Sequence, residues 1–410
     1  MNILSPQRPA SSLEGPRTHV PLWLLALFTL SGTLGMHMFV PGLPQAAAEL
    51  GASPASLKLT LSVYILGLGL GQLVYGPMSD RFGRRPTAIA GLLLFTVSGF
   101  AAIFAQSVGA LITLRLFQAL GGSAGLVVAR AVVRDTATTQ GATRRLALMN
   151  LMVMVGPGIA PLVGGALTSF VGWRSIFIAL CMLGVGNLVF AWRLLPETSR
   201  NKDSDTSIAT WARNYQSLLA SPAFIGYAIG GGCATTAHYA FIASAPFIFV
   251  DQLNRPANET GLYLAFVVSG VWLGSFLASR LIGKFSLNRF LVTTNAVSVA
   301  AALAFLLLAS SGHLSAPLVV SLMLVFNIGV GGAAPAALVL AISVNRHVVG
   351  SASGLYGFAQ MGIGATLTAL AGLGHDPAFS TSIVLASAGV VAQTSIWIAS
   401  HNRHGGPASV

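Results

Sequence analysis

Two histidines and one arginine lie inside long apolar stretches of the sequence, where a side chain that can carry charge is unusual. His37 lies within MHMFVP, His238 begins HYAFIASAPFIF, and Arg115 begins RLFQALGGSAG. Histidine gains and loses a proton near neutral pH, which suits a site that exchanges protons. A buried arginine must be paired or face water. These residue types therefore indicate proton exchange and charge pairing. The alternatives are a neutral, hydrogen-bonded histidine and an arginine whose head group reaches the nearby interface.

Aromatic and amide side chains inside the apolar stretches can contact an amphiphilic ligand. The candidates to line such a cavity are Tyr64, Gln118, Asn150, Tyr239, Phe241, Asn327, Tyr356 and Gln360. Taken singly, each is also explained by helix packing. The acidic residues all fall at the ends of the apolar stretches or between them. A cavity without a fixed acid is expected to accept neutral or zwitterionic compounds rather than to prefer cations.

Transmembrane helices are the elements that must position these residues. Of 410 residues, 54% are apolar and only 8% are charged, whereas an average soluble domain is about 25% charged. Runs of about 20 apolar residues predict helices that span a membrane, and runs that do not alternate do not fit a β-barrel. We expect an all-α integral membrane protein with twelve transmembrane helices. The expected spans are near residues 21–43, 57–78, 87–106, 109–131, 145–169, 175–195, 222–250, 259–283, 288–309, 315–343, 347–373 and 379–400.

A polar segment near the middle of the chain divides the expected spans into two sets of six. It covers residues 196–221, so the two halves are 1–195 and 222–410. Most lysines and arginines fall on the side that holds both termini and this segment, and the positive-inside rule makes that side cytoplasmic. Glycines recur at similar spacing in both halves, and repeated halves are common in secondary transporters. The first apolar run is long for a signal peptide and is expected to remain as the first helix.

Charge, cysteine and motif content exclude several other classes. The net charge of +12 comes from short basic clusters between apolar runs, a pattern that sets membrane orientation rather than nucleic-acid binding. Cys181 and Cys233 lie in apolar runs and are expected to pack as small residues, without a disulfide or metal. The sequence contains no phosphate loop or zinc-ligand spacing and no cluster of acids or nucleophiles within the spans. We therefore expect neither an enzyme nor a protein with a cofactor or metal.

The turn after the second expected span concentrates charge in the stretch GPMSDRFGRRP. Its distinctive residues are Gly76, Asp80, Arg81, Gly83, Arg84 and Arg85. This arrangement resembles the loop signature of the major facilitator superfamily, G-x-x-x-D-R-x-G-R-R. The resemblance implies a gate on the cytoplasmic side, and Arg134 with Asp135, at the end of the fourth span, is a candidate counterpart. The alternatives are a topology anchor and a solvated loop pair that contributes little energy.

Further segments resemble the bicyclomycin- and chloramphenicol-resistance subfamily of bacterial drug exporters. They are LGMHMFVPGLP, RLFQALGGSAG, ARAVVRD, APLVGG, GWRSIF and LLPET in the first half and HYAFIASAPFIF in the second. The fifth span also carries an element similar to the exporter-associated G-P-x-x-G-G motif. Its residues are Gly156, Pro157, Pro161, Gly164 and Gly165, with Ala160 in one glycine position. Ordinary small-residue helix packing is the alternative interpretation of this element.

The same resemblance implies roles for the titratable residues in the spans. Arg115 and Gln118 are similar to the superfamily's R-x-x-Q-G-x-G element, except that Ala119 replaces the first glycine. This implies that Arg115 takes part in proton coupling or in the response to substrate. The subfamily usually carries an acid at the position of His37. His37 is therefore the first candidate for proton coupling, and His238 is the second.

The function implied is export of drugs or small amphiphilic metabolites by proton antiport with alternating access. The expected setting is the bacterial inner membrane, with both termini cytoplasmic and the chain acting as a monomer. Its partners would be a small-molecule substrate, protons and the lipid bilayer. A dedicated exporter of one metabolite is an alternative. A membrane sensor built on a transporter scaffold is another, although such a sensor should carry a sizeable soluble domain.

Overall fold

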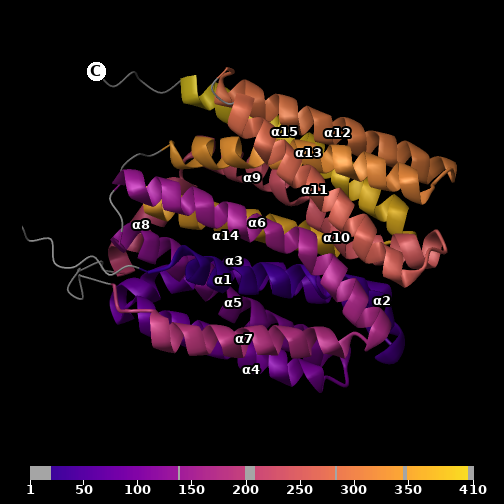
Figure 1. Ribbon diagram of the computed structural model, residues 1–410. Coiled ribbons are helices and arrows are strands. Elements are labelled where there is room, and N and C mark those ends of the chain that lie inside the picture. Colours follow the sequence, from indigo (N-terminus) through magenta and orange to yellow (C-terminus); the bar gives the residue numbers. More distant parts are fainter. Residues whose placement is uncertain (1–19, 137–138, 199–207, 282–283, 345–348, 405–410) are drawn as a thin grey trace, which may run out of the picture.

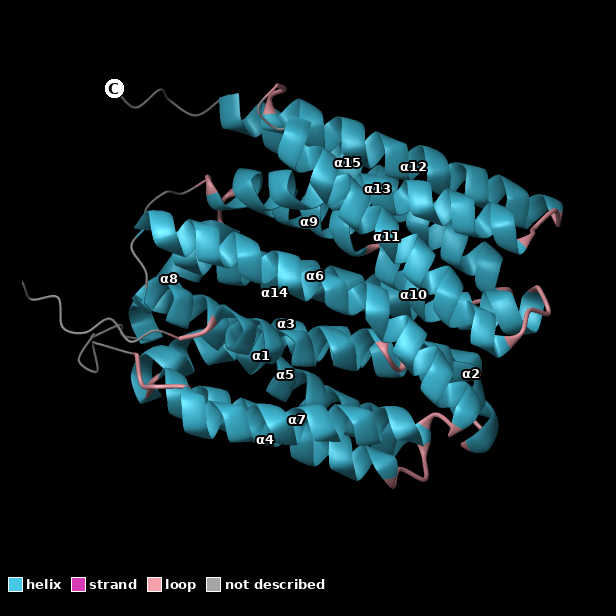
Figure 2. Cartoon of the chain, in the orientation of Figure 1, coloured by secondary structure: helices cyan, strands magenta, loops and turns pink. Residues whose placement is uncertain are grey.

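The computed structural model describes residues 20–136, 139–198, 208–281, 284–344 and 349–404. All regular structure in these ranges is helical (Figure 2), which confirms the all-α fold class. The helices of the first half are α1 (Leu22–His37), α2 (Leu43–Glu49), α3 (Pro54–Phe82), α4 (Arg84–Ile103), α5 (Val108–Thr136), α6 (Thr139–Phe170) and α7 (Arg174–Leu194). Those that follow are α8 (Ile208–Leu219), α9 (Pro222–Thr236), α10 (His238–Phe247), α11 (Ala257–Leu281), α12 (Leu287–Ser311), α13 (Ala316–Ile342), α14 (Val349–Leu370) and α15 (Pro377–His404).

The helices are built to lie in a membrane. In the described part of the chain, 10 helical segments are long and apolar enough to cross a bilayer. The other two predicted spans, near 145–169 and 347–373, correspond to α6 and α14. Large apolar side chains such as Met182 (71% exposed) and Leu307 (70% exposed) point outward. A soluble protein would not leave so many such groups in water, whereas lipid accommodates them.

The helices run side by side in one elongated bundle, with α8 at one end and α2 at the other (Figure 1). We call these the α8 end and the α2 end. The helices of residues 20–194 form one side and those from α9 onward form the other, and α6 and α14 overlap between them in this view. The two largest contacts between the sides are those between α3 and α14 and between α6 and α11. Such an arrangement leaves the middle of the bundle as the place where the two sides face each other.

Glycines let the central helix α5 approach its neighbours closely. A Cβ atom added at Gly125 would lie 2.2 Å from the Phe28 carbonyl oxygen of α1, and one at Gly121 would lie 2.5 Å from the Gly91 oxygen of α4. No larger residue fits at either position without moving a backbone. These contacts fix the rotation of α5 and so determine which of its side chains face the middle of the bundle.

Two of the predicted spans are interrupted near their middle. The first span was expected to end near residue 43, but α1 stops at His37 and the chain continues through the 3₁₀ turn Val40–Gly42 into α2. Pro41 and Pro44 lack the backbone N–H that an uninterrupted helix would use. In the seventh span, α9 and α10 are separated at Ala237, and α10 runs into the π-helical turn Ile248–Gln252. The polar segment between the halves also contains a helix, α8, which the hydropathy pattern did not predict.

Candidate functional site

A cavity of about 320 Å³ lies between the two sides of the bundle. It is lined by residues from α1, α3, α5 and α6 on one side and from α9, α10, α11, α13 and α14 on the other. Most of its wall is apolar, with polar groups such as Thr33, Gln72 and Ser123 between the apolar side chains. A volume of this size and a mixed wall suit a small amphiphilic molecule.

Both candidate histidines line this cavity, and each lies where its span is interrupted. His37 is the last residue of α1, and His238 is the first residue of α10. The Tyr239 ring lies beside both, with its centroid 6.4 Å from that of His37 and 4.1 Å from that of His238. The two histidines therefore come from opposite sides of the bundle and share one aromatic neighbour.

The backbone fixes the proton arrangement of the His37 ring. His37 Nδ1 lies 2.9 Å from the Thr33 carbonyl oxygen, one helical turn earlier. A carbonyl oxygen only accepts hydrogen bonds, so Nδ1 is the donor and carries the hydrogen. Nε2 is then the nitrogen that takes up a further proton. His37 is thus held in one orientation, and the contact with Thr33 leaves Nε2 unoccupied by this bond.

The cavity contains only part of the predicted ligand-binding set. Tyr239 and Gln360 line it, and Gln360 Nε2 donates to Thr235 Oγ1 at 2.7 Å. The other described candidates are buried in helix contacts outside the cavity wall, namely Tyr64, Gln118, Phe241, Asn327 and Tyr356. The side chain of Asn150 lies outside the described residues. The difference arises because span membership does not reveal the rotation of a helix about its axis.

Arg115 is fully buried but does not line the cavity. Its guanidinium carbon lies 3.9 Å from the Tyr64 ring centroid, 5.3 Å from that of Phe39 and 5.8 Å from that of Phe177. Its Nη1 donates to Gln118 Oε1 at 2.7 Å. Tyr64 in turn donates its hydroxyl to the Gly32 carbonyl oxygen. Cation–π contacts therefore hold Arg115 where three helices and the turn after α1 meet.

Several cavity residues were missed from the sequence, and Arg130 is the most prominent. It was counted only as a positive charge that sets orientation, yet it lines the cavity with Ser123 and Leu126 of the same helix. These three residues are spaced i, i+3 and i+7, which places them on one face of α5. That spacing, taken with Gly122 on the same wall, was the signal available in the sequence. Trp272 of α11 was missed because an isolated tryptophan in an apolar span carries no such pattern.

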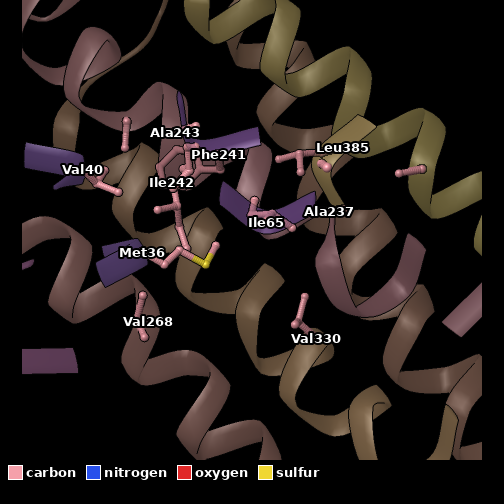
Figure 3. Close-up of a cluster of buried hydrophobic side chains, with 14 of the residues drawn as sticks. Met36, Val40, Ile65, Ala237, Phe241, Ile242, Ala243, Val268, Val330 and Leu385 are labelled. Carbon is pink, nitrogen blue, oxygen red and sulfur yellow. The ribbon is translucent and has the colours of Figure 1, made fainter. Parts of the chain in front are cut away.

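Buried apolar side chains from both sides of the bundle form a cluster next to the cavity, which we call the apolar plug. We give this name to Met36, Val40, Ile65, Phe241, Ile242 and Ala243, all of which are at most 2% exposed. Figure 3 shows these side chains gathered from α1, the turn after it, α3 and α10. The plug joins both sides of the bundle just beyond the two histidines.

A second contact between the sides reinforces the α2 end. Lys58 of α3 is 2% exposed, and its Nζ donates to the carbonyl oxygen of Ala371 at 3.3 Å. The same nitrogen lies 5.4 Å from the Phe247 ring centroid. Ala371 follows the last residue of α14, where the helix presents unpaired carbonyl oxygens and its negative dipole end. A cation from the first side thus caps a helix of the second.

The loop signature forms a compact charge cluster at the α8 end. Arg84 Nε donates to Asp135 Oδ2 at 2.8 Å, and its Nη1 bonds Asp80 Oδ1 and Ser79 Oγ. Arg85 donates to the Trp192 carbonyl oxygen of α7. The remaining members lie around this centre: Gly76 accepts from Ser79, Arg81 packs over the Phe82 ring, and Arg134 is exposed. Asp135 therefore bonds Arg84 of the signature.

Glu197 completes this cluster and was not singled out from the sequence, although it lies within LLPET. Its two carboxylate oxygens accept the backbone N–H groups of Arg84 and Arg85, at 2.9 and 3.2 Å. These are the first residues of α4, so the carboxylate caps the positive end of that helix. Gly83 has φ +99°, and a Cβ there would lie 2.4 Å from Glu197 Oε2. Gly83 thus allows the positive φ of the turn and leaves room for the Glu197 carboxylate.

The glycine- and proline-rich element of α6 packs on both sides of the bundle. A Cβ at Gly164 would lie 2.0 Å from the Met38 carbonyl oxygen, and one at Gly156 would lie 2.6 Å from Leu30 Cδ2. A Cβ at Gly165 would lie 3.5 Å from the Cα of Gly261 in α11. Pro157 lines the cavity, and the Pro161 carbonyl oxygen lies against Gly261. The element thus lies against the turn that follows His37 on one side and against α11 on the other.

The fold and the site together define a membrane transporter with a central cavity between two sets of helices. Residues 25–369 match the family model for the Major Facilitator Superfamily, and the chain belongs to this family. The chain is therefore a transporter and not an enzyme.

Individual relatives and solved structures agree with this assignment. The chain is 30% identical over 369 residues to the uncharacterized MFS-type transporter YdgK of Bacillus subtilis (strain 168), covering 88% of this chain and 91% of the relative. It is 28% identical over 372 residues to the multidrug transporter MdfA of Yersinia pestis bv. Antiqua (strain Angola), covering 90% of each. A chloramphenicol resistance protein of Pseudomonas aeruginosa is 36% identical over 176 residues, 43% of this chain and 42% of the relative. The nucleoside transporter NupG shares the fold, with a TM-score of 0.75 and 12% identity over 92% of this chain and 98% of its own.

Proposed function

We propose that this protein is a secondary active exporter of drugs or small amphiphilic metabolites, driven by proton antiport. The observation that carries the proposal is the cavity between the two sides of the bundle, which both histidines line at helix interruptions. The names of the multidrug and chloramphenicol-resistance relatives support drugs as the substrate class. Neutral amphenicols are the first compounds to test, because no acid of the described residues lines the cavity.

Contacts at the two ends of the bundle support alternating access as part of this proposal. At the α2 end, the apolar plug and the Lys58 contact join the sides. At the α8 end, the partners shown for Asp80, Arg84 and Arg85 belong to the first side alone. We assign the α8 end to the cytoplasm on the positive-inside rule. In this proposal the bundle is closed toward the outside, and export requires the plug to part while the α8 end closes.

Proton exchange takes place at the histidines. A proton entering from outside binds His37 Nε2, because Nδ1 already donates to Thr33. A charged imidazole is costly beside the apolar plug. Protonation of His37 therefore favours the conformation in which water enters the cavity from the cytoplasmic side of the membrane. Phe39, two residues along the chain, contacts Arg115. The Arg115 cluster is therefore placed to couple the turn after α1 to α3 and α5.

We further propose the bacterial inner membrane as the location, with both termini cytoplasmic and a monomer as the active unit. Division of function between the halves 1–195 and 222–410 belongs to the same proposal, since each half supplies one histidine.

Transport in inside-out vesicles tests the proposed function. An acid interior should drive uptake of chloramphenicol, and nigericin, which collapses the pH gradient, should stop it. A panel of chemically unrelated compounds separates a multidrug exporter from a dedicated metabolite exporter. Absence of uptake for the whole panel, with binding retained, would favour a sensor over a transporter.

A further inference from the structure

Arg130 is a cationic side chain in the cavity wall that the transport scheme above leaves without a role. It lies on the same face of α5 as Ser123 and Leu126, and all three line the cavity. At 1.5 Å per residue, it lies roughly 9 Å before the end of the helix at Thr136. Arg130 is exposed and lines the cavity, so a ligand in the cavity can approach it.

The acids closest to Arg130, both in sequence and at the α8 end of the bundle, form their interactions with other groups. Asp80 and Asp135 pair with Arg84, and Glu197 caps α4. No described acid lies within ion-pair distance of Arg130, and none lines the cavity. The other titratable groups of the wall are His37, His238 and Tyr239, none of which is an anion near neutral pH. The fixed charge of the described cavity wall is therefore positive.

The cavity wall also offers apolar surface on the second side of the bundle. Trp272 and Val271 of α11 and Met361 of α14 line it, and Gln72 supplies an amide. A ligand with a flat apolar ring system and one anionic group could place the ring against Trp272 and the anion on Arg130. Arginine presents a planar fork of donors that matches a carboxylate with two parallel bonds.

We propose that the cavity takes anionic amphiphiles, aromatic carboxylates above all, and that Arg130 is the residue that pairs with their charge. This inference rests on the proposed transport function and narrows its substrate class. It also has an energetic consequence. Export of a monoanion against one proton moves two charges, so a membrane potential that is negative inside adds to the driving force. A neutral substrate moves one charge, and a monocation moves none.

At a membrane potential that is negative inside, the anion therefore has the largest driving force for export. At a potential of 100 mV, each charge moved changes the accumulation ratio of the substrate by about fiftyfold. In proteoliposomes with a potassium diffusion potential and no pH gradient, we expect accumulation of the anion to exceed that of a neutral analogue. A permanent cation should not respond to the potential.

Binding of three matched probes to the purified protein in nanodiscs tests the proposal. The probes are 2-naphthoate, 2-naphthamide and trimethyl(2-naphthylmethyl)ammonium, which share one ring system and differ in charge. We expect 2-naphthoate to bind most tightly and the cation least. Arg130→Gln should weaken 2-naphthoate binding about tenfold or more, since a hydrogen bond to a charged group is lost. It should leave 2-naphthamide within about twofold, and Arg130→Lys should restore part of the loss.

Arg289→Gln is the matched control, because this exposed arginine lies on α12, which contributes no residue to the cavity wall. It should leave all three affinities unchanged. Equal affinity for the anion and the cation, or an equal loss for all probes in Arg130→Gln, would overturn the proposal. If Arg130→Gln does not fold, the order of the three probe affinities in the parent protein still tests the charge preference. Proton-driven chloramphenicol uptake without 2-naphthoate binding would overturn this inference and leave the proposed function standing.

Discussion

At the scale of single residues, the position of a side chain about its helix axis decides what it can do. His37 and Arg115 both lie in apolar spans, yet the first lines the cavity and the second is enclosed by Tyr64, Phe39 and Phe177. Hydropathy identified both residues because either charge is costly in lipid. It did not distinguish them, because the rotation of a helix is set by contacts such as Gly125 against Phe28.

The two adjacent glycines of α6 give a prediction at this scale. Gly164→Ala should destabilise the protein by about 1–3 kcal/mol, since its Cβ would lie 2.0 Å from the Met38 carbonyl oxygen. Gly165→Ala should change stability by less than about 0.5 kcal/mol, because its nearest neighbour, Gly261, is at an ordinary 3.5 Å. Thermal unfolding in detergent measures both. An equal loss for the two variants would contradict the packing described here.

At the scale of elements, the turn between α3 and α4 is held by residues far apart in the sequence. Gly83 and Arg84 belong to the recognisable signature, and Glu197 lies 113 positions after Arg84. The signature was visible because its spacing is local. The cap was not visible, because a single glutamate after a span has many possible partners until the helices are placed.

Removing the charge of that cap should weaken the start of α4. Glu197→Gln keeps the size of the side chain but loses two charge-assisted hydrogen bonds and the favourable interaction with the helix dipole. We expect a loss of about 1.5–3 kcal/mol in stability. Glu259→Gln is the control, because Glu259 lies at the start of α11 and bonds only a tyrosine of its own helix among the contacts shown. A smaller loss for Glu197→Gln than for Glu259→Gln would contradict the role of the cap.

At the scale of the whole molecule, the bundle is joined at the α2 end by contacts that transport must break. Lys58 and Ala371 meet there, and a Cβ at Gly372 would lie 3.6 Å from the Cα of Ala55. These residues belong to opposite sides of the bundle. The distance falls within the reach of a disulfide between two introduced cysteines.

A disulfide at this point should stop transport. In a background with Cys181→Ala and Cys233→Ala, oxidation of the double variant Ala55→Cys and Gly372→Cys should cross-link the two sides. Substrate uptake should then fall to background and return on reduction, because alternating access needs this end to open. The single-cysteine variants serve as controls. Unchanged uptake by the cross-linked protein would mean that the sides do not separate here.

The sequence was sufficient for the class of fold and insufficient for the cavity. Span positions followed from hydropathy, since each helix must bury about 20 apolar residues in lipid. The interruption after His37 was missed because the apolar run continues through Pro41 and beyond. Tyr239 and Gln360 line the cavity, whereas Tyr64 and Tyr356 do not. That difference depends on helix rotation and on contacts between the two sides, which no local pattern records.

The central claim is that a histidine exchanges the proton that drives export. The measurement is chloramphenicol accumulation in inside-out vesicles with an imposed gradient of one pH unit, for the parent protein, His37→Ala and His238→Ala. One coupled proton sustains about tenfold accumulation at such a gradient.

The account predicts that His37→Ala loses this accumulation while chloramphenicol still binds and equilibrates across the membrane. His37→Asp should restore accumulation, since a carboxylate at the same place also exchanges a proton. Full gradient-driven accumulation by His37→Ala and by His238→Ala alike would contradict the account.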